Sequence, residues 1–220
     1  MAKLFRIVAL VSGGGTTLQN LIDRISTGNL AVEIAGVVSS RADAFGVERA
    51  KKAGLPVTVV SRANPGRKSE GFVPSSPPDL RPGFANEVWS AVRSFAPDLV
   101  VLAGWLHLLP IPADFRHRVL NIHPALLPAF GGKGMYGRHV HEAVLAYGAK
   151  VSGCTVHFAD ETYDTGPIVV QKCVPVKEGD APDALAARVF AAECDAYPEA
   201  IELIASGRVA VQGRRVIISD

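Results

Sequence analysis

The sequence has little of several features that mark particular classes of protein. It holds three cysteines in 220 residues, Cys154, Cys173 and Cys194, and this odd number without zinc-like spacing argues against a disulfide framework and indicates a reducing compartment. Basic residues outnumber acidic ones only by 23 to 21, so net charge does not favour a polyanion, and any anion must bind at a local site. The apolar run at 4–11 is too short to cross a membrane. We expect a cytoplasmic protein that binds neither nucleic acid nor membrane.

Apolar residues, in contrast, are plentiful. They make up 48% of the chain, enough for the core of one ordinary domain. Apolar runs typical of buried strands alternate with segments of helical periodicity in the first half of the chain, which predicts βαβ units with right-handed crossovers. We therefore expect an α/β fold with one doubly wound, mostly parallel sheet and an antiparallel C-terminal part. We expect a single domain, 1–220, with an N-terminal half, 1–104, and a C-terminal half, 105–220.

The expected elements follow from periodicity and from Gly and Pro positions. Strands are expected at 4–11, 32–38, 55–60, 98–104, 119–123, 151–159 and 168–176, helices at 18–25, 42–53, 84–95, 138–147 and 181–205, and a terminal hairpin at 209–218. The segment 61–82 holds five prolines and is expected to be an insertion or a lid. The glycine-rich segment 130–137 is expected to be a mobile loop.

A glycine loop, residues 12–17, separates the first expected strand from the first helix. Glycines allow the backbone to approach a ligand closely, and the helix start offers unpaired N–H groups, so Gly14, Gly15, Thr16 and Thr17 are candidate phosphate ligands. Neither the dinucleotide fingerprint nor the P-loop pattern fits this loop. A mononucleotide or phosphosugar site remains, with a plain tight turn as the alternative.

Two polar side chains lie at the end of the expected strand 119–123. Asn121 and His123 are two residues apart, so both face the same side, where they could polarise a carbonyl and move a proton. A structural role is the alternative for a single histidine. Asp164 lies in an expected turn, where it either forms an Asx turn or orients an imidazole. Periodicity alone does not bring Asp164 to His123.

Three sequence motifs, taken together, are similar to those of a known enzyme family. The segments Ser12-Gly-Gly-Gly-Thr-Thr-Leu-Gln19, Asn121-Ile-His-Pro-Ala-Leu-Leu-Pro128 and Asp164-Thr-Gly-Pro-Ile168 resemble the phosphoribosylglycinamide formyltransferases, the folate-dependent transformylases of purine synthesis. The likeness extends over nearly the whole chain and includes 42–49, 98–104 and 188–193. It implies that 1–104 is the phosphate-binding half and 105–220 the catalytic and folate-binding half. It implies formyl transfer from 10-formyltetrahydrofolate to the amine of glycinamide ribonucleotide, with no metal, by a monomer or homodimer.

The resemblance also implies site residues. It makes Asn121, His123 and Asp164 catalytic, with an imidazolium favoured by Asp164, and makes 14–17 the phosphate loop, in which Thr17 replaces a more usual asparagine. Glu193 and Pro124 would hold the glycinamide end, although a solvated helix face is the plain alternative for Glu193. The implied folate contacts are Arg81, Leu106, His107, Leu108, Leu109, Asp160, Glu161, Thr162 and Tyr163.

Alternative functions remain open. A formyltetrahydrofolate hydrolase or another folate-dependent formyltransferase, such as one acting on methionyl-tRNA, could share the three catalytic residues, although the extra domains usual in those enzymes are not expected here. An NADP-dependent reductase is a different class, suggested by the glycine loop and by Arg41 after the second strand. A binding module without catalysis is a third. His139 and His141 are weak metal candidates, because residues two apart on a helix point away from each other.

Overall fold

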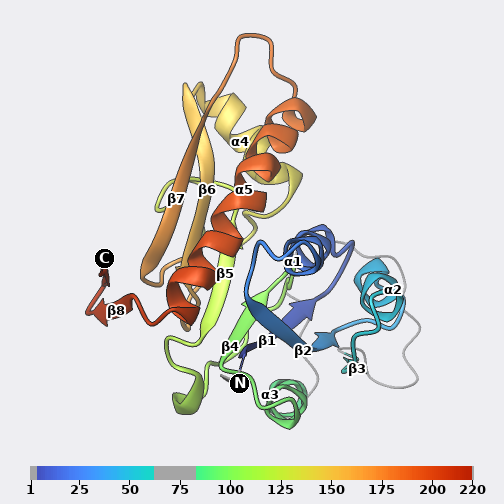
Figure 1. The fold of residues 1–220 in the computed structure, drawn as a ribbon. Coiled ribbons are helices and arrows are strands. Elements are labelled where there is room, and N and C mark those ends of the chain that lie inside the picture. Colours follow the sequence, from blue (N-terminus) through green and yellow to red (C-terminus); the bar gives the residue numbers. More distant parts are fainter. Residues whose placement is uncertain (1–3, 62–82, 220) are drawn as a thin grey trace. The chain divides into compact units, whose positions relative to one another are not determined.

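A computed structural model describes residues 4–61 and 83–219 of the chain (Figure 1). The chain divides into two compact units, Met1–Pro110 and Ile111–Asp220. The proline-rich segment predicted at 61–82 lies, apart from Ser61, outside the described residues.

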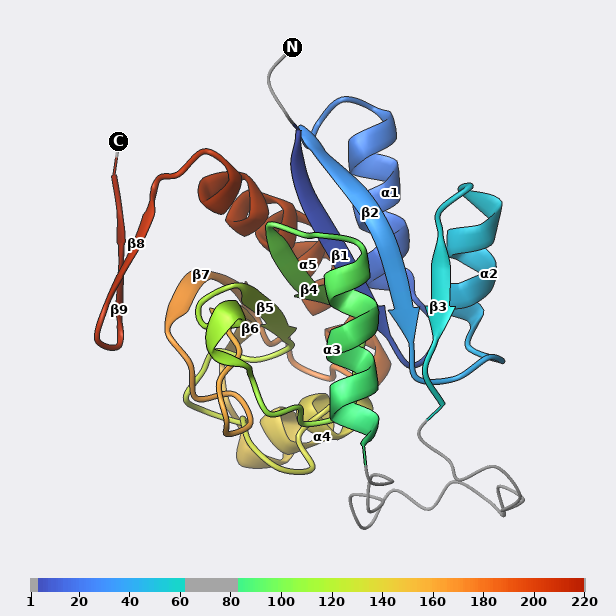
Figure 2. The same ribbon diagram turned by 90° about the horizontal axis from the view of Figure 1, so that it is seen from below.

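The described part of the first unit is a parallel sheet covered by helices. Its strands are β1 (Phe5–Val11), β2 (Val32–Ser39), β3 (Val57–Val59) and β4 (Leu99–Leu102), in the order β3-β2-β1-β4. Helices α1 (Thr16–Ser26) and α2 (Phe45–Lys52) lie on one face and α3 (Phe84–Ser94) on the other (Figures 1 and 2). Residues 7–11 of β1 are fully buried. This two-sided cover explains why β1 is a continuous apolar run rather than an alternating one.

Antiparallel strands form the sheet of the second unit. In the described residues β5 (Val119–His123), β6 (Val151–Phe158) and β7 (Ile168–Pro175) pair in the order β5-β6-β7. A short 3-10 helix, Ala113–Phe115, precedes β5, and α4 (Arg138–Tyr147) connects β5 to β6. The long helix α5 (Pro182–Ala205) follows β7, and β8 (Val209–Gln212) and β9 (Arg215–Ile218) form a terminal hairpin. The predicted α/β class with an antiparallel C-terminal part is confirmed.

Helix α5 fixes the position of β5. It packs against β6 and β7, and its fully buried residues include Tyr197 and Ile201. The Tyr197 hydroxyl donates a 2.8 Å hydrogen bond to the carbonyl of Leu120. Because a buried hydroxyl without a partner is costly, this bond ties the helix to the strand one residue before Asn121.

Three predicted elements are at least three residues shorter in the structure than in the prediction. Helix α2 begins at Phe45 and not at 42, because Ala44 is extended, with ψ 131°, and Arg41 pairs with Asp43 just before it. Strand β3 covers only 57–59 of the expected 55–60, and β4 only 99–102 of the expected 98–104. None of these changes alters the order of the elements.

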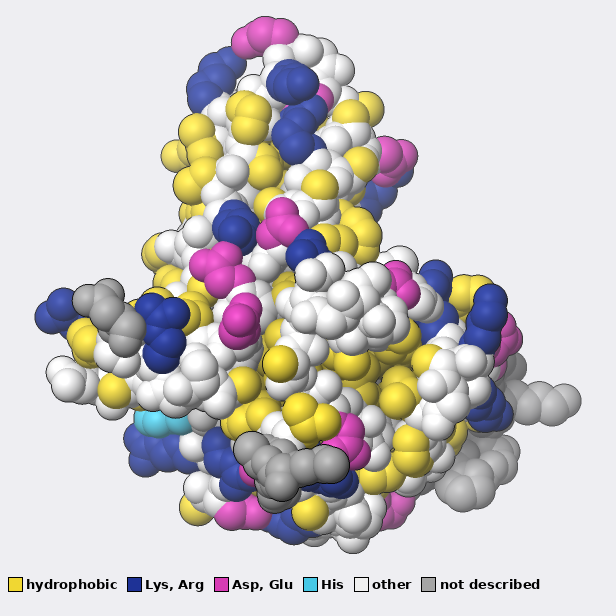
Figure 3. Space-filling view, in the orientation of Figure 1, with side chains coloured by type: hydrophobic (Ala, Val, Ile, Leu, Met, Phe, Trp, Pro, Cys, Tyr) yellow, Lys and Arg dark blue, Asp and Glu magenta, His cyan; other side chains and the backbone are white. Residues whose placement is uncertain are grey.

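The surface carries charges of both signs. On the face drawn in Figure 3, Lys and Arg side chains are interspersed with Asp and Glu side chains and with apolar ones. This distribution matches the nearly balanced composition. Among residues 4–61 and 83–219, no helix is both long enough and apolar enough to span a membrane.

Candidate active site

The end of β5 presents two polar side chains toward one side of the sheet. Asn121 and His123 stand opposite His157 and Thr155 in the antiparallel register with β6. His123 is buried and Asn121 is partly buried. Because β5 is held on one edge by β6 and by Tyr197 of α5, both side chains project from a fixed backbone.

Asp164 reaches the same place from the turn between β6 and β7. Its Oδ2 lies 3.5 Å from Nδ1 of His123, and its Oδ1 lies 3.7 Å from Nε2 of His157. The Asx turn in this segment belongs to Asp160, whose Oδ1 accepts the N–H of Thr162 at 3.0 Å. Asp164 itself has φ 58°, a left-handed conformation in which aspartate is enriched. The structure thus brings the predicted aspartate to the predicted histidine.

Backbone groups of residues 130–132 hold both members of this pair. The Phe130 carbonyl accepts a 2.8 Å hydrogen bond from Nε2 of His123, and the Gly132 N–H donates one of 2.9 Å to Oδ2 of Asp164. Between them, a Cβ on Gly131 would lie 3.3 Å from the Asp164 Cβ and 2.5 Å from a neighbouring side-chain carbon. No pattern in the sequence predicts these contacts, apart from the signal that the adjacent glycines Gly131 and Gly132 give.

Burial and contacts set the charge of the His123–Asp164 pair. Burial lowers the pKa of His123, and this effect exceeds the opposite effects of Asp164 and of the Phe130 carbonyl. Burial alone would raise the pKa of Asp164. The neighbouring His157 and His123 rings and the Gly132 N–H lower this pKa by more than burial raises it, so its net direction is down. Near neutral pH the pair is therefore a neutral imidazole beside an ionised carboxylate. Asp164 favours the imidazolium, as expected, but burial outweighs this effect.

The hydrogen bonds of His157 orient Asn121. Its Nδ1 lies 3.0 Å from the carbonyl oxygen of Phe158, so this nitrogen carries the proton. Nε2 then accepts a hydrogen bond of 3.1 Å from Nδ2 of Asn121. An amide nitrogen has two N–H groups, so Asn121 keeps one for a ligand.

Glu193 on α5 is a carboxyl group without a hydrogen bond or an ion pair to any described residue. Burial raises its pKa to about 7. A mostly desolvated carboxyl without a partner is costly unless a ligand supplies donors, so an amine or amide ligand is chemically suitable. Pro124, the other residue expected to hold the glycinamide end, directly follows His123 and is partly buried.

The glycine loop of the first unit leads into α1 as predicted. Gly15 is the residue before the helix, with φ 68°, and the first intrahelical hydrogen bond runs from the Gln19 N–H to the Gly15 carbonyl at 2.9 Å. The N–H groups of Thr16 and Thr17 precede that bond and are available to an anion. No side chain caps this helix start. The loop therefore has the geometry expected of a phosphate site, whereas its role stays a prediction.

The residues expected to bind folate fall into three groups. Arg81 lies outside the described residues. In the first unit, residues 106–109 follow β4, with Leu106 exposed and Leu109 buried. In the second unit, the turn at 160–163 is ordered by Asp160, which also accepts a hydrogen bond from the Thr165 hydroxyl at 2.8 Å.

Other candidates from the sequence do not join a site. His139 and His141 lie on different faces of α4, since His139 is exposed beside Glu142 and His141 is buried. In the part of the chain that is described, no group of three potential metal ligands is present. The Arg41 guanidinium, proposed for a 2′-phosphate, is engaged by both carboxylate oxygens of Asp43, at 3.0 and 2.6 Å.

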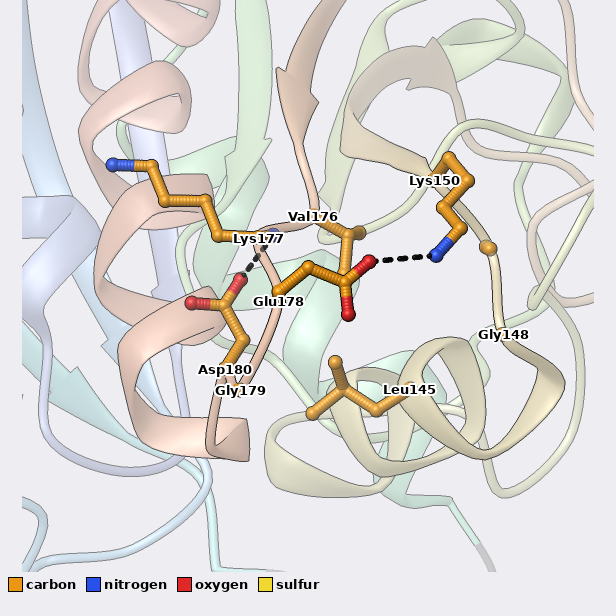
Figure 4. A pocket seen from close by; sticks show the side chains of 9 residues that line it. Leu145, Gly148, Lys150, Val176, Lys177, Glu178, Gly179 and Asp180 are labelled. Carbon is orange, nitrogen blue, oxygen red and sulfur yellow. Dashed lines mark hydrogen bonds and ion pairs between the residues drawn. The ribbon is translucent and has the colours of Figure 1, made fainter.

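A surface pocket of about 240 Å³ lies between the end of α4 and the turn after β7 (Figure 4). Lys150 pairs with Glu178 at 3.1 Å, and the Lys177 N–H donates to Asp180 at 2.8 Å. None of the predicted site residues lines this pocket.

Comparison with known proteins decides the family. The family described as formyl transferase matches residues 5–201. The chain belongs to the formyl transferase family. The resemblance expected from the three motifs is thereby confirmed, and Asn121, His123 and Asp164 all lie within the matched region.

Named relatives of the formyl transferase chain agree with this assignment. It is 40% identical over 206 residues to a chloroplastic phosphoribosylglycinamide formyltransferase of Arabidopsis thaliana, covering 93% of this chain but 66% of that protein, just under two thirds. It is 38% identical to the phosphoribosylglycinamide formyltransferase of Escherichia coli (strain K12), covering 92% of this chain and 88% of that one. The crystal structure of glycinamide ribonucleotide transformylase 1 from Symbiobacterium toebii superposes with a TM-score of 0.84 at 41% identity, covering 99% and 95% of the two chains.

Proposed function

We propose that this chain transfers a formyl group from 10-formyltetrahydrofolate to the amine of glycinamide ribonucleotide, a step of purine biosynthesis. The observation that carries the proposal is the His123–Asp164 pair at the end of β5, with Asn121 beside it. The relatives named above support the choice of substrates, and the glycine loop supports a phosphorylated acceptor. Formylfolate is a co-substrate in this reaction, and no step uses a metal.

In the first step the acceptor amine attacks the formyl carbon. A nitrogen–carbon bond forms, and the electrons of the carbonyl double bond move onto the oxygen, which becomes negatively charged. The second N–H of Asn121 donates to this oxygen, as does the Nε2–H of His123 after it exchanges the Phe130 carbonyl for the substrate. Donors that are already oriented cost little reorganisation, which is why such groups accelerate acyl transfer.

In the second step a proton moves from the acceptor nitrogen to the leaving nitrogen of the folate. The ionised Asp164 accepts the proton directly or through one water, and Nδ1 of the neutral His123, 3.5 Å away, shares it. The electrons on the negatively charged oxygen then re-form the carbonyl double bond. The bond between the formyl carbon and the folate nitrogen breaks, and its electron pair stays on that nitrogen, which takes the proton. The lowered pKa of His123 suits this role, because it keeps the ring neutral near pH 7 and a neutral ring has a nitrogen lone pair that can accept a proton.

Binding groups place the substrates for these steps. The backbone of 14–17 binds the acceptor phosphate, and Glu193 with Pro124 contacts its glycinamide end. Residues 106–109, 160–163 and Arg81 contact the folate. Much of the rate gain in such a reaction comes from holding the amine and the formyl carbon in contact.

The test is an absorbance assay of folate release, with each substrate omitted in turn. The proposal predicts turnover only when both substrates are present. Absence of turnover with both would overturn it, and equal folate release without the acceptor would instead indicate a hydrolase. Cytoplasmic location and a monomeric or homodimeric state stay predictions.

A further inference from the structure

Arg49 of α2 lies against the glycine loop and has no role in the function proposed above. Its Nε donates a 2.9 Å hydrogen bond to the carbonyl of Gly14, and its Nη1 donates one of 3.1 Å to Oε1 of Gln19. The guanidinium carbon also sits 4.8 Å from the centre of the Phe45 ring. One side chain thus joins the loop, the first turn of α1 and the first turn of α2.

Close backbone packing brings Arg49 to this position. A Cβ on Gly15 would lie 2.6 Å from the Cα of Gly46, so no side chain fits between the loop and α2. The Gly46 N–H also donates a 2.9 Å hydrogen bond to the carbonyl of Gly13. Helix α2 therefore rests directly on the loop, and Arg49, one turn further along the helix, reaches the Gly14 carbonyl.

The hydrogen bond between Arg49 and the Gly14 carbonyl affects how well the loop can bind an anion. A loop that binds phosphate through N–H groups also contains carbonyl oxygens, whose partial negative charge repels the ligand. Arg49 holds the Gly14 carbonyl by a charged hydrogen bond, and thereby fixes the direction in which the neighbouring peptide groups point. A guanidinium has five N–H groups, and the two bonds to Gly14 and Gln19 leave the others for a ligand or water.

We propose that Arg49 is a positioning residue for a phosphate monoester at the glycine loop. It keeps the Gly14 carbonyl engaged and adds positive charge beside the N–H groups of Thr16 and Thr17. This inference rests on the proposed phosphate site and goes beyond it, because it assigns part of the selectivity for a phosphorylated acceptor to a side chain outside the loop.

The test compares Arg49→Met and Arg49→Lys with wild type, using glycinamide ribonucleotide and its dephosphorylated riboside as acceptors. Charged hydrogen bonds contribute about 1.5–3 kcal/mol, so Arg49→Met should raise KM for the ribonucleotide by roughly 10- to 100-fold. We expect kcat to change less than about threefold and kcat/KM for the riboside to stay near the wild-type value. Arg49→Lys should restore part of the loss, because it keeps the charge but not the planar fork.

Lys52→Met is the matched control, because Lys52 is exposed on the same helix and its replacement removes the same charge. It should leave both KM values unchanged. Equal losses with ribonucleotide and riboside in Arg49→Met would show a merely structural role and overturn the proposal, as would an unchanged KM. If Arg49→Met does not fold, Arg49→Lys decides by the same comparison.

Failure of the proposed function can be distinguished from failure of this inference. If the wild-type chain transfers no formyl group, calorimetric titration with ribose 5-phosphate still tests Arg49. Weaker binding to Arg49→Met or Arg49→Lys than to wild type would support the positioning role. Equal binding, or no binding to wild type, would overturn it.

Discussion

The glycine loop and the end of β5 offer different chemical groups to a ligand. The loop at 12–17 offers mainly backbone N–H groups, and its shape depends on residues that lack a side chain, above all Gly15. The end of β5 offers buried titratable side chains, and its chemistry depends on the charge that burial allows on His123 and Asp164. A larger side chain in place of a glycine should therefore be the most disruptive change in the glycine loop. At the end of β5, removal of one ionisable group should be the most disruptive change.

The largest effect is expected from His123→Ala and Asp164→Asn. Each removes a group that donates to the oxyanion or accepts the proton, so kcat should fall about 10²- to 10⁴-fold. His139→Ala, an exposed histidine on α4, is the control and should retain wild-type turnover. Steady-state formyl transfer measures all three variants, and near-normal turnover in either active-site variant would remove the assignment.

Within the glycine loop, Gly15→Ala should cause the largest loss of stability. The new Cβ would meet the Gly46 Cα at 2.6 Å, and φ 68° is itself unfavourable for alanine by roughly 1–3 kcal/mol. Gly28→Ala is the control, since φ is 75° there but nothing lies within 4 Å. Urea unfolding should show a larger loss of stability for Gly15→Ala. Equal losses would mean that the contact with α2 is unimportant.

Glu193→Gln tests the unpartnered carboxyl through pH. The pKa is raised from the usual 4.5 to about 7, so between these values the folded chain keeps a proton that the unfolded chain has lost. Wild-type stability therefore falls as pH rises through this window. Glu193→Gln should remove that fall and be more stable than wild type at pH 8, by on the order of 1–3 kcal/mol.

The control for that experiment is Glu202→Gln, an exposed position on the same helix, which should keep the wild-type pH dependence. Urea unfolding between pH 4.5 and pH 8 supplies the curves. Parallel curves for Glu193→Gln and wild type would contradict the account of Glu193.

The smallest effect is expected from Tyr197→Phe. It leaves the Leu120 carbonyl without its buried donor and should lower the free energy of unfolding by about 1–2 kcal/mol. Tyr147→Phe is the control, because Tyr147 is 82% exposed and should have no measurable effect. Thermal unfolding distinguishes them, and equal melting temperatures would mean that this bond does not help to hold β5.

Local patterns made much of the fold predictable from the sequence. The continuous apolar run of β1, the glycine loop before α1 and the alternation that places Asn121 beside His123 all depend on neighbours in the chain. The approach of Asp164 depends on how the β6–β7 turn folds back, and no local pattern encodes that. The Phe130 carbonyl and Gly132 N–H are backbone atoms present at every position, so their contacts have no sequence signature. The net pKa of His123 depends on burial, which exists only in the folded chain.

The central claim is that His123 and Asp164 work as one unit. A double-mutant cycle on kcat with His123→Ala, Asp164→Asn and the double variant tests it most directly. If the pair acts together, the double variant should be about as slow as the slower single variant. Losses that multiply in the double variant would show two independent contributions and contradict the account.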